Sequence, residues 1–125
     1  MFLLQNLPEH IAREAEEVTE LLRKSFANKI CSVVVFGSAV RGWKENPEDL
    51  DILIVVDVPR EEALEAKRMF VEDGVDLRLG EKYGLHPQII ILSKEDVGGG
   101  SASFYYSIVH DGVAIYGEKA YLLKR

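Results

Sequence analysis

Residues 33–57, VVVFGSAVRGWKENPEDLDILIVVD, contain the pattern that decides the fold. An apolar run over 30–36 stops at a Gly-Ser pair, and an Asp-Leu-Asp triplet opens a second apolar run, 52–56, within an expected strand over 50–57. Runs of this length that are rich in valine and isoleucine and bounded by turn residues predict strands. We expect these two strands to be joined by a short helix over 38–43 and a loop over 44–48, whose proline disfavours helix just before it.

The second strand begins with two acidic residues, Asp49 and Asp51. Because side chains alternate along a strand, residues two apart point to the same face, so both carboxylates can be aimed at one point. Mg²⁺ in proteins is commonly held by one or two carboxylates together with substrate phosphates. The spacing therefore predicts a metal-binding pair at the start of this strand.

The turn between the first strand and the short helix is formed by Gly37 and Ser38. Glycine lets the backbone approach a ligand closely. The first turn of a following helix offers free backbone N–H groups to an anion. One segment of the chain thus supplies both a candidate phosphate cradle and a candidate metal clamp.

These features resemble the minimal nucleotidyltransferases of the DNA polymerase β superfamily, whose signature is Gly-Ser, ten residues, and then Asp-x-Asp. Here ten residues, Ala39 to Glu48, separate Gly37-Ser38 from the acid pair, and an Arg-Gly step lies within GSAVRG. The motif covers about a fifth of the chain. The resemblance implies an α/β (α+β) nucleotidyltransferase fold with a small mixed sheet flanked by helices on one side.

By the same resemblance, Asp49 and Asp51 would be the catalytic and Mg²⁺-binding residues. Gly37 and Ser38 would bind the terminal phosphates of ATP or another NTP. The implied reaction transfers a nucleoside monophosphate to a hydroxyl group and releases pyrophosphate.

Two basic residues of the same segment, Arg41 and Lys44, are further candidates for contacts to phosphate. The planar guanidinium of Arg41 matches phosphate oxygens. Lys44 is equally well explained as an ordinary surface lysine. Both are expected on the nucleotide side of the site.

The family commonly places a third carboxylate on the next core strand. In this chain that strand is HPQIIIL, residues 86–92, and the matching position is Gln88. An amide oxygen can coordinate a metal, but the group carries no charge and cannot act as a base. Four other groups are conceivable substitutes, although each is more often surface charge or strand-shaping: His86, Asp73, Asp76 and Glu81.

The rest of the chain supplies elements for one domain, residues 1–125. Helical periodicity and cap residues predict helices at 8–27, 59–73 and 103–110, with further strands at 87–92 and 113–116. The segment 75–84 is left open between an extra turn, a hairpin edge and a flexible lid.

Composition narrows the class of protein. The chain has 125 residues, 47% of them hydrophobic, and a net charge of −6. A binder of long nucleic acid needs a basic surface, so the acidic balance argues against that class. No apolar run approaches the length of a membrane span. We expect a cytoplasmic protein whose single cysteine, Cys31, is a buried thiol in a strand.

The motif is similar to that of the antitoxins that pair with helical HEPN-type toxins and attach AMP to them. The resemblance therefore implies such a partner protein as the acceptor. The alternative is a catalytically impaired module that binds nucleotide or masks a partner, which Gln88 favours. A homo-oligomer is also conceivable, because the apolar residues at 2–4 and 121–123 could form contact surfaces.

Overall fold

A computed structural model describes residues 7–41, 49–97, 106, 108 and 110–117. Within them, four strands form one mixed sheet in the order β3-β2-β1-β4. The strands are β1 (Ile30–Phe36), β2 (Asp49–Val56), β3 (His86–Ser93) and β4 (Val113–Gly117). β1 is antiparallel to both β2 and β4, whereas β2 and β3 are parallel. The predicted strands are confirmed, each within one residue at either end.

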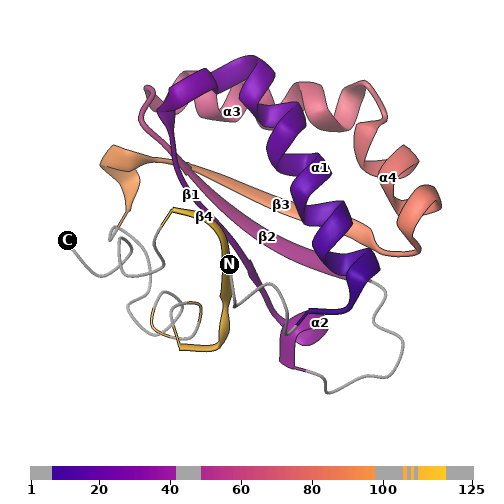
Figure 1. Cartoon of the computed structure of the whole chain (residues 1–125). Helices are drawn as coiled ribbons and strands as arrows, with labels where there is room; N and C mark the ends of the chain where they lie inside the picture. Colours follow the sequence, from indigo (N-terminus) through magenta and orange to yellow (C-terminus); the bar gives the residue numbers. More distant parts are fainter. Residues whose placement is uncertain (1–6, 42–48, 98–105, 107, 109, 118–125) are drawn as a thin grey trace.

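Three long helices lie along one face of the sheet, as Figure 1 shows. They are α1 (Glu9–Phe26), α3 (Arg60–Glu72) and α4 (Val75–Tyr83). The short helix α2 (Ser38–Arg41) follows β1, and 3-10 turns span Ala27–Lys29 and Lys94–Asp96. No helix in the described ranges is long and apolar enough to cross a membrane.

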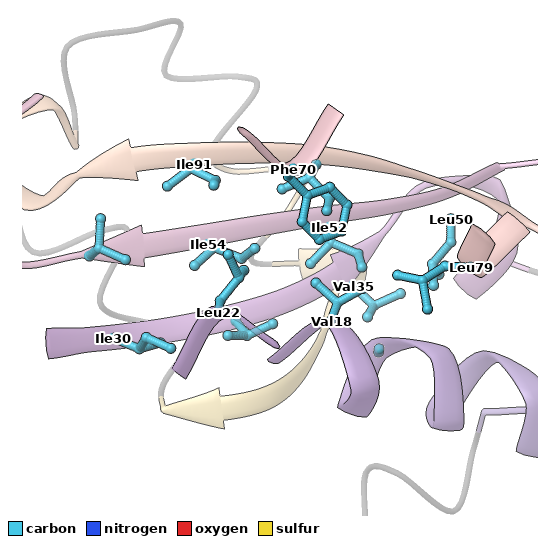
Figure 2. Close-up of a cluster of buried hydrophobic side chains, with 14 of the residues drawn as sticks. Val18, Leu22, Ile30, Val35, Leu50, Ile52, Ile54, Phe70, Leu79 and Ile91 are labelled. Atoms are coloured by element: carbon cyan, nitrogen blue, oxygen red, sulfur yellow. The ribbon is translucent and has the colours of Figure 1, made fainter. Parts of the chain in front are cut away.

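The main core lies between the sheet and these helices. Figure 2 shows Leu22 of α1 and Phe70 of α3 beside Ile52 and Ile54 of β2, with Ile91 on the neighbouring strand β3. Since side chains alternate along β2, its even-numbered residues face the helices and Asp49, Asp51 and Leu53 face away. A smaller apolar cluster covers that second face and contains Val34, Leu53, Val55, Val97 and Ile108. The acid pair thus lies on the face that is not covered by the long helices.

The open segment 75–84 folds as the nine-residue helix α4. Two features hide its helical pattern in the sequence. Gly80 lies inside the helix, and Asp76, a charged residue, takes one of its buried positions beside Leu79. Of the three alternatives considered, neither a hairpin edge nor a lid describes this packed helix.

α4 is linked to α1 through the carboxylate of Glu17. Its Oε1 accepts hydrogen bonds from the Tyr83 hydroxyl at 2.5 Å and from the Lys82 ammonium at 2.9 Å. These two donors, Tyr83 first, hold the pKa of Glu17 below its usual value. The contact fixes the C-terminal end of α4 against the middle of α1.

Cys31 differs from expectation, because it is half-buried rather than buried. Most of its strand is buried, but Cys31 packs against the smaller cluster, as does the half-buried Phe36 at the end of the strand. The described residues of the predicted helix 103–110, namely Tyr106, Ile108 and His110, are helical. The apolar segments 2–4 and 121–123, proposed as contact surfaces, lie outside the described residues.

Candidate active site

The acid pair lies in the middle of the sheet, between β1 and β3. Asp51 is the register partner of Phe36 on β1 and of Gln88 on β3, and Asp49 is paired with His86. Partners in register project to the same face of a sheet. Asp51 is half-buried and Asp49 is exposed. One row of side chains across three strands therefore faces a common space at the start of β2.

Gly37 closes that row on the β1 side. Its φ of 82° is in the left-handed region, which side chains other than glycine adopt at a cost. A Cβ atom at this position would lie only 2.1 Å from Oδ2 of Asp51. Both constraints require glycine here. The Asp51 carboxylate thus lies directly against the backbone of the Gly-Ser turn, which the sequence motif only implied.

Two of the remaining predicted phosphate contacts follow Gly37 in α2. Ser38 is the first residue of this helix and is half-buried, and Arg41 is its last. The turn is held by a hydrogen bond of 3.1 Å from the amide of Val40 to the carbonyl of Gly37. Lys44, like the rest of 42–48, lies outside the described residues.

On the β3 side the row continues into a chain of hydrogen bonds. Nε2 of His86 lies 3.2 Å from Oδ2 of Asp76, and Nδ1 of His86 lies 3.2 Å from the amide nitrogen of Gln88. The second oxygen of Asp76 accepts the amide of Leu77 at 2.9 Å. Two of the four candidate substitutes for a third acid, Asp76 and His86, are therefore brought together beside Gln88.

The other two candidates are not part of this group. Asp73 is exposed and follows the last residue of α3, and Glu81 is exposed on α4. No hydrogen bond among the described side chains links either of them to the row of Asp51 and Gln88. The structure gives no support to a role for Asp73 or Glu81 at the acid pair.

The donor set fits a hard divalent cation. The face of the sheet presents two carboxylates and one amide, and such ions prefer oxygen ligands. In the parts of the chain that are described, no three or more histidine, cysteine or acidic side chains are grouped to hold a metal. A cation bound by Asp49 and Asp51 would thus need further oxygens, which nucleotide phosphates and water can supply.

Sequence reasoning missed one buried acid, Glu14 of α1. Its side chain is 0% exposed, and neither carboxylate oxygen has a hydrogen-bond partner in the described structure. Burial, with a smaller contribution from Glu17, raises its pKa to about 8. The signal was available, because position 14 falls on the same helical stripe as the buried Ile11 and Val18.

Comparison with protein-family models gives one match. The model of the nucleotidyltransferase domain matches residues 15–109, about three quarters of the chain. This range contains the glycine turn, the acid pair and β3. No curated protein sequence matches the chain.

Solved structures give the same picture at low sequence identity. A toxin–antitoxin complex with AMP-PNP aligns with a TM-score of 0.54 at 16% identity, covering 88% of this chain and 82% of the other. A tri-AMPylated HEPN toxin from Shewanella oneidensis in complex with its MNT antitoxin aligns at 0.53 and 15%, covering 91% and 82%. Spectinomycin adenyltransferase AAD(9) from Enterococcus faecialis, with ATP and spectinomycin, aligns at 0.62 and 17%, covering 84% and 55%. At these identities the likeness shows a shared fold.

Proposed function

The chain belongs to the nucleotidyltransferase domain family, and from this premise we propose that it transfers a nucleoside monophosphate from an NTP to a hydroxyl group of a partner protein. ATP is the proposed donor. The single observation that carries the proposal is the contact between the Asp51 carboxylate and Gly37. It joins the candidate metal ligands and the candidate phosphate turn in one place.

Each residue of the Gly37 turn and of α2 has a separate task in this proposal. The hydroxyl of Ser38 and the backbone of the Gly37 turn donate to terminal phosphate oxygens. Arg41 neutralises phosphate charge with its planar guanidinium. Holding the triphosphate in one orientation leaves the α-phosphorus open to attack by the acceptor hydroxyl. The acceptor oxygen bonds to the α-phosphorus, the bond to pyrophosphate breaks, and the hydroxyl proton passes to water.

Asp49 and Asp51 would hold Mg²⁺, which they suit because both are strand-borne carboxylates on one face. When bound, the ion stabilises negative charge on the attacking and leaving oxygens. Gln88 is in register with Asp51, and in this proposal it stands where the family commonly has a third acid. Under this proposal the chain contributes one negative charge fewer to its site than the common pattern.

A protein acceptor is supported by the charge of the chain and by the structures that align with it. Its net charge of −6 disfavours long nucleic acids as substrates. The aligned structures include an MNT antitoxin that was solved in complex with a HEPN toxin. In that complex the toxin is AMPylated. We infer that a helical protein of this kind brings the acceptor hydroxyl, and that the reaction takes place in the cytoplasm.

The proposal is tested by label transfer. The protein is incubated with Mg²⁺, each α-³²P-labelled NTP in turn, and the product of the adjacent gene. We expect label on the partner with ATP, and none with the double variant Asp49→Asn/Asp51→Asn. Glu62→Gln, which removes a carboxylate from the exposed start of α3, is the matched control and should retain transfer. Equal labelling by wild type and the double variant would refute the assignment of the site.

Gln88 favours a second candidate, a module that binds nucleotide and masks its partner without transfer. An amide cannot take the proton of the acceptor hydroxyl. Under this reading the partner is neutralised but carries no label. A Gln88→Glu variant that gains transfer where wild type has none would support the module, since the fold would then lack only the acid.

A further inference from the structure

A relay of three side chains connects α4 to the row of the acid pair. Asp76 is 8% exposed and lies in the first turn of α4. His86 and Gln88 are two residues apart on β3, at the edge of the sheet. The three also line one small cleft of about 90 Å³ between β3 and the helices α3 and α4.

The direction of the relay follows when Asp76 is ionised and the His86 ring is neutral. A carboxylate oxygen of Asp76 accepts, so Nε2 of His86 must carry the hydrogen in the 3.2 Å contact. In a neutral imidazole the other nitrogen, Nδ1, is then an acceptor. It faces the amide nitrogen of Gln88 at 3.2 Å, which donates to it.

This direction decides which end of the Gln88 amide is available to a ligand. Its nitrogen is engaged by His86, so its oxygen is the end left to act as a ligand, on a residue that is in register with Asp51. A freely rotating amide would have to be ordered before its oxygen could meet a cation, at a cost in conformational entropy. The relay orders the amide in advance.

We propose that Gln88 is a neutral oxygen ligand of the metal–nucleotide complex and that Asp76 and His86 are positioning residues that orient its amide. The inference rests on the proposed nucleotide site and deepens it. Outer partners that orient a ligand contribute about 10–100-fold to metal affinity in known sites. A comparable contribution is expected from this relay.

Binding of Mn²⁺, followed by electron paramagnetic resonance in the presence of AMP-PNP, tests the proposal without any need for turnover. We expect Gln88→Ala, His86→Phe and Asp76→Leu each to weaken Mn²⁺ binding about tenfold. Asp76→Asn should stay close to wild type, because its amide oxygen still accepts from His86. His10→Phe, at an exposed histidine of α1, is the matched control.

Two further readouts separate positioning from general structural support. In the Gln88→Ala background, His86→Phe should cause no additional loss of Mn²⁺ affinity. Nitrogen-15 shifts of the His86 ring should report the Nε2–H form in wild type and in Asp76→Asn. An additional loss in the Gln88→Ala background, or a ring protonated on Nδ1, would overturn the relay.

The outcomes also separate this proposal from the one it rests on. If Asp49→Asn abolishes Mn²⁺ binding while Gln88→Ala and His86→Phe leave it unchanged, the relay is wrong and the nucleotide site stands. If wild type and Asp49→Asn bind Mn²⁺ equally, both proposals are wrong. Circular dichroism shows whether Asp76→Leu is folded. If Asp76→Leu unfolds, His86→Phe tests the relay instead, because His86 is half-exposed.

Discussion

Replacing Glu14 by glutamine should remove a strong pH dependence of stability. Glu14 is enclosed between α1 and the rest of the core, and burial raises its pKa from 4.5 to about 8. At neutral pH the folded protein therefore keeps this carboxyl protonated, whereas the unfolded chain ionises it. The Gln variant keeps a neutral group of similar shape at the same place.

The sign and size follow from proton linkage. Between pH 4.5 and about 8 the folded state holds one proton more than the unfolded state at Glu14, so stability falls as pH rises. The slope is about −1.4 kcal/mol per pH unit at 25 °C. Over the whole interval the loss amounts to about 5 kcal/mol, and above pH 8 it is complete.

Urea unfolding followed by circular dichroism, at pH values from 5 to 9, measures this loss. The quantity to compare is the free energy of unfolding of Glu14→Gln minus that of wild type, because all other titrations cancel in the difference. It should rise by about 1.4 kcal/mol per pH unit and level off near pH 8. Glu16→Gln, at an exposed position of the same helix, is the control and should give a flat difference.

A difference for Glu14→Gln that stays constant across this range would refute the reasoning. It would mean that Glu14 ionises at its ordinary pKa in the folded protein, so that the carboxyl is hydrated or paired.

Three further changes have defined outcomes. Gly37→Ala should weaken binding of Mg²⁺·AMP-PNP, measured by calorimetry, because its Cβ displaces the Asp51 carboxylate. The left-handed backbone adds a stability cost of about 1–2 kcal/mol. Unchanged binding would contradict the contact between Gly37 and Asp51. Tyr83→Phe should raise the pKa of Glu17, followed by carbon-13 NMR, and reduce stability by about 1 kcal/mol; an unmoved pKa would exclude the hydrogen bond. Ile54→Ala should cost about 2–5 kcal/mol in urea unfolding because the residue is fully buried, whereas a loss below about 1 kcal/mol would contradict its packing.

The strands and the acid pair could be predicted because their signals are local. β1 and β2 are mostly apolar runs bounded by turn residues, and alternation alone places Asp49 and Asp51 on one face. The mixed sheet followed from the family resemblance. Asp51 is in register with Gln88, and the correspondence of Gln88 to the third acid of the family stays a prediction from the resemblance.

What could not be predicted depends on contacts between distant residues. The helix α4 carries Gly80 inside and Asp76 on its buried side, so its pattern was ambiguous. The burial of Asp76 is explained only by its contact with His86, which is ten residues away along the chain. In the same way, the approach of Asp51 to Gly37 is a property of paired strands that no spacing along the chain can report.

The central claim is that the acid pair and the glycine turn together hold a metal-bound triphosphate. Isothermal titration calorimetry with AMP-PNP, in the presence of Mg²⁺ and then of EDTA, tests it most directly. We predict saturable binding by wild type that requires Mg²⁺ and is lost in Asp49→Asn/Asp51→Asn, with circular dichroism unchanged. Binding of equal affinity in the double variant, or in EDTA, would contradict the claim.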